Sequence, residues 1–380
     1  MRIADIRAIP ISFPVPADKS VRLGIGRSVK RDAVLVRVET DEGHVGWGEA
    51  HHGRCPGAIA RLIDTTLREL VLGLDAHDVA GVWARVYKMQ LASHGMGAAA
   101  AMALSGLDMA LWDLRCQATG WPLYRLLGGS AKPIKAYAGG IALGWQEPAL
   151  LAEEALQHIA TGYRALKLRV GDTAVKDIAR VRAVRQAVGD EIDLLVDANT
   201  NYTLDDVRKV MPAFEEAAVG WLEEPFPPQD RRAYALAASF GRVPLAAGEN
   251  HFTRYEFATL IEDGQVQFVQ PDLSKTGGVT EAMRIAAMAS AQKLTVNPHT
   301  SATAINMATT IHFLCGVDNP GYFEGDVTAL NPFRDHLADK LPYRLDSSGC
   351  VTPNEGVGIG LVIDLDFIAE HPLIEGPCYV

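Results

Sequence analysis

The chain has 380 residues, of which 48% are hydrophobic and 22% are charged. This composition excludes a disordered protein, and the length suits one large α/β domain of about 200 to 250 residues with a smaller partner. The net charge of -10 argues against a nucleic-acid-binding protein.

The cysteines and the apolar runs indicate in which cellular compartment the protein resides. The five cysteines are scattered without a CxxC pair, which argues against a disulfide framework or a zinc site and favours a reducing cytosol. The N-terminal residues MRIADIRAIPISF predict a strand rather than a signal peptide, and no apolar run is long enough to span a membrane. We therefore expect a cytoplasmic enzyme or binding protein with no membrane contact.

Residues 1–128 are predicted to form an α+β capping domain. Apolar residues alternate in the strand manner around Ile3–Ile11 and Val34–Val38, and a helical pattern runs from about 56 to 120. The polar, glycine-containing segment 15–30 between the first two strands predicts a mobile loop.

Residues 129–330 are predicted to form the catalytic barrel. Eight short apolar runs begin 22 to 31 residues apart, enough for one strand, one loop and one helix, such as the helix predicted at 173–188. The runs are Ile134–Tyr137, Ala165–Arg169, Asp193–Asp197, Gly220–Glu223, Leu245–Glu249, Gln267–Asp272, Thr295–His299 and Tyr322–Glu324. No glycine-rich phosphate turn follows the first, which favours a modified (β/α)₈ barrel over an open sheet. Residues 331–380, including a strand-like stretch at 351–364, should return to the capping domain.

Carboxylates at the ends of neighbouring strands predict a metal site. Asp197, Glu223 and Glu249 are spaced 26 residues apart, so each occupies an equivalent place on three successive strands. Three hard oxygen ligands favour Mg²⁺. The alternative is that each acidic residue caps the helix that follows its strand.

Basic groups end the other strands. Lys167 and Arg169 are two residues apart and should point the same way into the barrel. Asp272 on the sixth strand can fix the tautomer of His299 on the seventh, which would suit the histidine to proton transfer. The alternative is an ordinary hydrogen-bonded histidine.

Several stretches together resemble the mandelate racemase subgroup of the enolase superfamily. They are VGWGEA, ALSGLDMALWDLRCQATGWPLYRLLGG, ALKLRVG, LLVDAN, WLEEP, GEN, QPDLSKTGG and NPHTSA. The resemblance implies that Asp197, Glu223 and Glu249 bind Mg²⁺, that Asp272 and His299 form a catalytic dyad, and that Glu324 hydrogen-bonds a substrate carboxylate oxygen. It also implies removal of a proton α to a carboxylate to give a metal-stabilised enediolate.

The departure from the family pattern is Arg169, which stands where a second lysine is usual. An arginine is a poor base and should lower the pKa of Lys167. Either His299 alone removes the α-proton and protonates the leaving β-hydroxyl, or Lys167 removes it from the opposite face. We expect a Mg²⁺-dependent dehydratase of an aldonate or aldarate. A racemase, epimerase or sugar-lactone cycloisomerase is the alternative, and a catalytically idle binding protein is the alternative of another class.

Substrate recognition is expected from loops over the site. Their polar groups suit a small, anionic, polyhydroxylated acid and are Asn199, Arg22, His51, Arg54 and Lys275. Lys275 lies three residues beyond Asp272, which suggests a loop position behind the reacting groups. Barrels of this kind often associate, so a homo-oligomer is expected.

Overall fold

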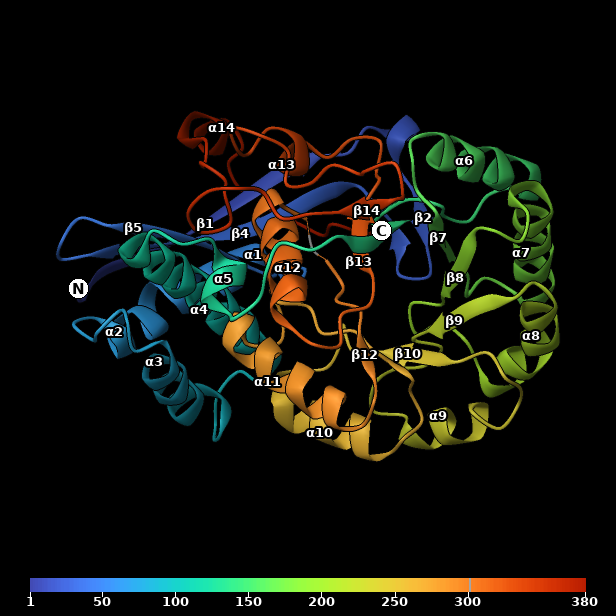
Figure 1. The fold of residues 1–380 in the computed structure, drawn as a ribbon, viewed down its shortest axis with the longest axis horizontal. Coiled ribbons are helices and arrows are strands. Elements are labelled where there is room, and N and C mark those ends of the chain that lie inside the picture. Colours follow the sequence, from blue (N-terminus) through green and yellow to red (C-terminus); the bar gives the residue numbers. More distant parts are fainter. Residues whose placement is uncertain (301) are drawn as a thin grey trace.

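The computed structural model describes residues 1–300 and 302–380. An α+β domain lies at one end and a curled parallel sheet ringed by helices at the other (Figure 1). The first domain contains an antiparallel sheet in the order β1–β4–β5, formed by β1 (Ile3–Pro14), β4 (Lys30–Thr40) and β5 (Val45–Ala50). The long helix α4 (Ala98–Thr119) packs against β5 and β4.

Two glycines allow α4 to lie directly on β5. A Cβ added to Gly48 would lie 2.1 Å from the carbonyl oxygen of Gly106 in α4, and one added to Gly46 would lie 2.2 Å from that of Ala110. The backbones therefore approach more closely than any side chain permits. This contact fixes the orientation of β5, whose C-terminal end leads into the loop with His51 and Arg54.

The second domain confirms the predicted barrel. Its parallel strands run in the order β12–β11–β10–β9–β8–β7–β6–β13, and an isolated bridge between Val296 and Pro320 links the two ends. The strands are β6 (Ile134–Gly139), β7 (Ala165–Arg169), β8 (Asp193–Asp197), β9 (Val219–Glu223), β10 (Leu245–Ala247), β11 (Phe268–Val269), β12 (Thr295–Val296) and β13 (Phe323–Asp326).

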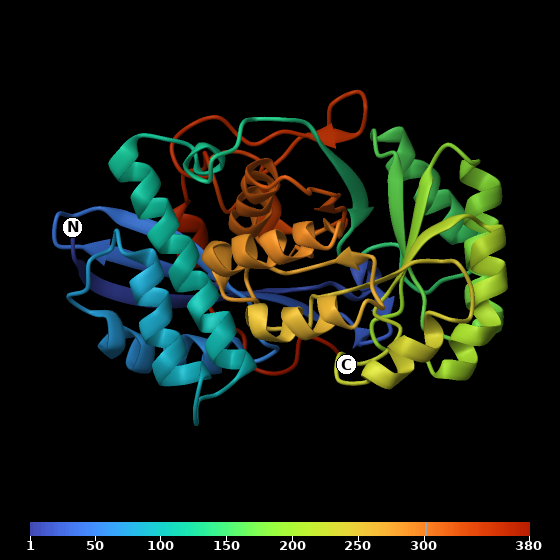
Figure 2. The ribbon, with the colours of Figure 1, turned by 60° about the horizontal axis from the view of Figure 1, so that its bottom comes forward.

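Helices cover the outside of this sheet (Figures 1 and 2). They are α6 (Pro148–Ala160), α7 (Ala174–Val188), α8 (Leu204–Glu216), α9 (Arg231–Ala237), α10 (Thr253–Glu262), α11 (Gly278–Ala291) and α12 (Ala304–Gly316). Within the described residues, no helix combines the length and apolarity needed to cross a membrane.

Three strands end earlier than predicted. Glu249, Asp272 and His299 lie two or three residues beyond the ends of β10, β11 and β12. The positions of their side chains therefore depend on loop conformation. Glu249, for example, follows Gly248, whose φ is 152°. Beneath them, Tyr137, Trp221, Tyr322 and Phe268 pack edge to face or tilted and fill the interior. The site therefore rests on a packed core rather than an open pore.

The strand predicted over 351–364 is wrong. Only Cys350 and Val351 form a strand, β14, which pairs antiparallel with β6 of the barrel. Gly356, Gly358 and Gly360 all have positive φ, a conformation that breaks a strand. The chain then forms α14 (Leu365–Glu370) and returns to the first domain through bridges from Pro372 to Ile11 and from Tyr379 to Ser28.

Candidate active site

A cavity of about 480 Å³ lies where the carboxyl ends of the barrel strands face the loops of the first domain and the C-terminal tail. Glu249, Lys275 and His299 line it from the barrel, and His51 and Tyr379 line it from the other segments. This is the end of a barrel at which catalytic groups are found.

The first two predicted metal ligands are neighbours in the sheet. Asp197 and Glu223 are paired residues at the ends of β8 and β9, and both are buried. Lys167 on β7 lies between the carboxylates: its Nζ is 2.8 Å from Glu223 Oε1, 3.4 Å from Asp197 Oδ2 and 3.1 Å from Glu324 Oε1. The structure thus brings these four predicted residues together.

The expected lowering of the Lys167 pKa is wrong. Burial does oppose the charged ammonium, but the carboxylates of Glu223 and Glu324 outweigh it and hold the pKa well above its usual value. Arg169 instead pairs with Asp197 and donates from Nη2 to the carbonyl oxygen of Gly140 at 2.6 Å. Its charge is therefore directed at the carboxylate rather than at the lysine.

The oxygen atoms around these cations suit a hard divalent ion. Burial and the charge of Asp197 raise the pKa of Glu223 to about 7, and burial and Glu249 hold that of Glu224 well above its usual value. Glu224 Oε1 and Asn199 Oδ1 are buried without a hydrogen-bond partner among the described residues. A crowded group of carboxylates beside two buried oxygen atoms without a partner fits Mg²⁺. Glu224 was missed in the sequence; its adjacency to Glu223 in WLEEP is the available signal.

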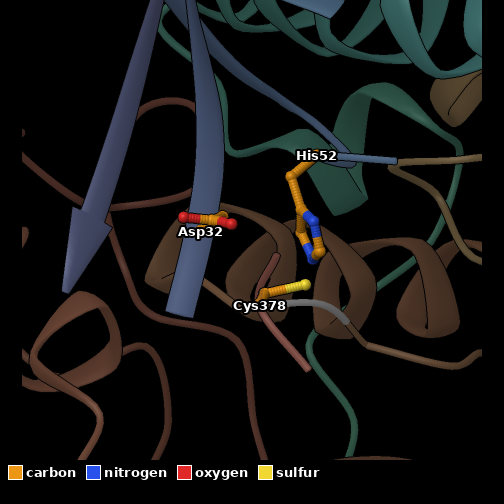
Figure 3. Close-up of side chains that lie close together, drawn as sticks. All are labelled: Asp32, His52 and Cys378. Carbon is orange, nitrogen blue, oxygen red and sulfur yellow. The ribbon is translucent and has the colours of Figure 1, made fainter. Parts of the chain in front are cut away.

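The three predicted ligands do not have all their ligand atoms within 4.8 Å of one another, and each of them contacts a cation of the protein. Among the described residues, one group of three has all its ligand atoms within 4.8 Å of one another, and it is Asp32, His52 and Cys378 (Figure 3). In that group Lys30 Nζ lies 2.9 Å from Asp32 Oδ2 and compensates the carboxylate charge.

His299 and Asp272 form the predicted pair. His299 Nδ1 lies 2.7 Å from Asp272 Oδ2, and Nε2 lies 2.8 Å from Glu249 Oε2. Burial alone would lower the histidine pKa, but the charges of Glu249 and Glu324 and the hydrogen bond to Asp272 reverse this and raise it to about 10. Asp272 is held in turn by the backbone N–H and hydroxyl of Ser274 and by Asn306 Nδ2.

The two candidate bases differ in access to the cavity. Within the described part of the chain, the cavity wall includes His299 and Arg169 but not Lys167, whose side chain has no exposed surface. Glu324 is equally buried and accepts hydrogen bonds from the backbone N–H groups of Gly140 and Thr300 at 3.1 and 3.2 Å. Of the two candidate bases, the histidine is therefore the one placed to reach a ligand.

Most of the predicted recognition residues line the cavity, and one does not. Asn199, His51, Arg54 and Lys275 line it, and Lys275 is buried with its Nζ 3.4 Å from Glu249. Arg22 is exposed on β2 (Arg22–Leu23), and its loop presents Leu23 and Ile25 to the cavity instead.

Sequence reasoning also missed cavity residues from distant segments. Arg31, Asp326 and Tyr379 line the cavity. Arg31 lies within an ordinary alternating strand and Tyr379 within a short tail, so neither carries a local signal of function.

Comparisons with known proteins agree with this architecture. Residues 8–128 match the family model of the mandelate racemase/muconate lactonizing enzyme N-terminal domain, and residues 150–367 match the enolase C-terminal domain-like model. A structure of an enolase superfamily member from Polaromonas sp. JS666 is 52% identical, with a TM-score of 0.97 and full coverage of both chains. A racemase from Streptomyces coelicolor A3(2) with bound magnesium is 30% identical, with a TM-score of 0.87, and 98% of this chain and 100% of that chain are covered.

Two relatives carry assigned reactions. An arabinonate dehydratase from Saccharolobus solfataricus is 30% identical over 95% of this chain and 96% of the relative. A 3,6-anhydro-alpha-L-galactonate cycloisomerase from Streptomyces coelicolor is 32% identical over 90% of this chain and 91% of the relative. Both act on sugar acids.

Proposed function

Because the chain belongs to the mandelate racemase/muconate lactonizing enzyme family of the enolase superfamily, we propose that it is a dehydratase of a sugar acid. The product would be a 2-keto-3-deoxy acid. The arabinonate dehydratase among its relatives supports this reaction class.

One observation carries the choice of reaction. A racemase or epimerase that uses two bases needs one on each face of the substrate, both in contact with the cavity. Here His299 lines the cavity, whereas Lys167 is sealed below it and Arg169 cannot serve as a base. Of the two candidate bases, only the histidine is accessible, which suits an elimination in which one residue acts as both base and acid.

The residues that would hold Mg²⁺ are Asp197, Glu223 and Glu249, with Glu224 and Asn199 beside them. When bound, the ion would stabilise negative charge on the substrate carboxylate.

Side chains of the protein carry out the proton transfers and stabilise the charges. His299 must first be neutral, and this state is favoured when the Glu249 carboxylate, which raises the histidine pKa, is neutralised by a divalent ion. The neutral imidazole takes the proton from the carbon α to the carboxylate, and the electron pair of that C–H bond moves into the substrate as an enediolate. Re-formation of the carboxylate creates a C=C bond as the β C–O bond breaks, and the imidazolium returns its proton to the departing hydroxyl, which leaves as water. The resulting enol tautomerises to the keto acid. Asp272 keeps the imidazole oriented and stabilises its charge, and Arg169 presents a fixed cation to the substrate.

A panel assay tests the proposal. The protein with Mg²⁺ is incubated with aldonates and aldarates in D₂O, 2-keto acids are detected as semicarbazones, and α-hydrogen exchange is followed by NMR. We expect keto-acid formation that the variant His299→Asn abolishes. Exchange or inversion at the α-carbon without keto acid would show a racemase or epimerase instead.

A cycloisomerase is the second candidate, because one relative with that name matches 90% of the chain. Lys275 and His299 both contact Glu249 Oε2 and line the cavity, so two proton carriers share one face of the site. Opening of a sugar lactone or anhydro ring in the same panel, with no keto acid from open-chain acids, would favour this reaction.

A further inference from the structure

The side of the cavity remote from the strand ends carries positive charge that carboxylates compensate only in part. Permanent cations in the cavity wall outnumber carboxylates: Arg31, Arg54, Arg169 and Lys275 stand against Glu249 and Asp326. Arg169 and Lys275 are paired with the carboxylates at the strand ends. Of the two arginines from the first domain, Arg31 has one carboxylate contact, at 3.4 Å from Asp326, and Arg54 has none among the described residues.

Arg54 has no carboxylate partner among the described residues. Its guanidinium instead lies over the ring of Tyr379, 5.6 Å from the ring centroid. The backbone of Arg54 has a φ of 60°, and its N–H donates to His52 Nδ1 at 3.0 Å, so the loop holds the residue in this place. Arg54 is exposed, so water solvates its charge in the free protein, and an anion in the cavity would pair with it.

Arg31 is buried and only partly satisfied. Its Nη1 lies 3.4 Å from Asp326 Oδ2, and its Nη2 is buried with no hydrogen-bond partner among the described residues. The aspartate is already bound by Asn331 Nδ2 at 2.6 Å and by the N–H of Thr328 at 2.8 Å. A buried donor without an acceptor is destabilising, and an acceptor in the cavity would remove that penalty.

Tyr379 lies near both arginines, Arg31 and Arg54. It lines the cavity, and the charges of Arg31, Arg169 and Arg54 all act to lower the pKa of its phenol, although burial raises that pKa overall to about 12. Tyr379 therefore lies close enough to these arginines to feel their charge, and the guanidinium of Arg54 lies over its ring. We call Arg31, Arg54 and Tyr379 the distal wall.

The residues next to the distal wall in the sequence also lie close together. Asp32, His52 and Cys378 have ligand atoms within 4.8 Å of one another, and each lies one or two residues from a member of the wall (Figure 3). Two backbone hydrogen bonds attach the C-terminal tail to the first domain. The N–H of Val29 donates to the Cys378 carbonyl at 2.9 Å, and the N–H of Val380 donates to the Arg27 carbonyl at 3.0 Å. The wall is thus organised before any ligand binds, which favours affinity.

We propose that this enzyme acts on a diacid, an aldarate rather than an aldonate, and that Arg31, Arg54 and Tyr379 bind the second carboxylate. The proposal rests on the proposed function, because the first carboxylate is assigned to the strand ends. A terminal hydroxymethyl group would leave the wall's charge uncompensated, whereas a carboxylate matches two guanidinium groups and a phenol donor.

The experiment compares acids that differ only at the remote carbon. Values of kcat/KM are measured for galactarate against galactonate and for glucarate against gluconate, with Mg²⁺ present. We expect at least one diacid to exceed its monoacid by about tenfold or more. The variant Arg54→Gln should abolish that preference by lowering the value for the diacid alone, and Tyr379→Phe should reduce it. Arg27→Gln, an exposed arginine of the neighbouring loop, is the matched control and should change neither value.

A binding measurement separates the two proposals. The inactive variant His299→Asn is titrated with galactarate and galactonate by calorimetry, with and without the additional change Arg54→Gln. Tighter binding of the diacid that depends on Arg54 supports the role of the distal wall in binding the second carboxylate. If the diacid binds in this way but no acid is dehydrated, the proposed function alone is overturned. Equal kcat/KM and equal affinity for the two acids, or equal losses for both in Arg54→Gln, would overturn the diacid proposal while a dehydratase remained.

Discussion

His299 Nδ1 and Asp272 Oδ2 lie 2.7 Å apart, and the aspartate side chain has no exposed surface. The two residues follow different short strands, β12 and β11, and neither belongs to its ladder. The contact sets which histidine nitrogen faces the cavity, because Nδ1 is committed to the carboxylate.

Replacing Asp272 by Asn should lower kcat with little change in fold. The amide cannot stabilise an imidazolium and can impose the wrong tautomer, so we expect a loss of about 10² to 10⁴. Steady-state kinetics on the best substrate measure it, with circular dichroism and Mg²⁺ titration as controls. A kcat within about fivefold of the parent would show that the contact does not matter to catalysis.

Lys167→Met should leave α-hydrogen exchange in place. The lysine has no surface in the cavity, so removal of the α-proton is assigned to His299. Deuterium incorporation from D₂O measures the exchange separately from dehydration. Loss of exchange in a folded variant that still binds Mg²⁺ would instead identify Lys167 as the base.

Removal of the metal should inactivate the protein without unfolding it. In the absence of an ion, Lys167, Arg169, Lys275 and His299 already compensate the carboxylates. Chelation should therefore abolish keto-acid formation, and added Mg²⁺ should raise the melting temperature by mass action. Glu223→Gln should reduce that rise, whereas Glu216→Gln, an exposed change on α8, should not; equal rises in both would remove Glu223 from the ligand set.

Gly48→Ala should destabilise the first domain. The new methyl group would collide with the backbone of α4, so we expect a loss of about 1 to 3 kcal/mol in unfolding free energy, with overpacking as the cause. Gly43→Ala is the control: nothing lies within 4 Å of its Cβ, and only the positive φ of 83° opposes it, for about 1 kcal/mol. Chemical denaturation of both variants gives the comparison, and the same loss in each would contradict a steric effect at Gly48.

Asp108 should make stability depend on pH. Burial raises the pKa of this carboxyl to about 7 from an ordinary value of 3.8, and its Oδ2 accepts from the N–H of Thr280 at 2.9 Å. The folded state then binds the proton more tightly than the unfolded state, so the Asp108 contribution falls as the pH rises from about 4 to 7. The unfolding free energy of the parent minus that of Asp108→Asn should decrease over this range; a constant or rising difference would contradict the assignment.

The fold and the central groups could be predicted because they repeat along the chain. Arg169, Asp197 and Glu223 end strands of five residues in direct register, so strand spacing alone places them side by side. Glu249, Asp272 and His299 follow shorter strands. They still lie close to their predicted places because the carboxyl ends of parallel strands lie at the same end of the barrel.

The loops over the cavity could not be predicted in the same way. Arg22 and Arg54 look alike in the sequence, but β2 turns the first to solvent and the loop after β5 turns the second to the cavity. The strand expected over 351–364 failed because apolar alternation does not report the positive φ of its glycines. The direction of the Lys167 pKa shift depended on which charges surround it, and these come from three strands.

The sequence by itself determined the barrel, its family and the ionisable residues at the strand ends, since these follow from local periodicity and from residue types at fixed spacing. Only the tertiary structure decided that His299 lines the cavity while the side chain of Lys167 is buried away from it. It also decided that Arg31 and Tyr379 line the same cavity. Access and counterion pairing depend on segments hundreds of residues apart, and no local pattern carries that information.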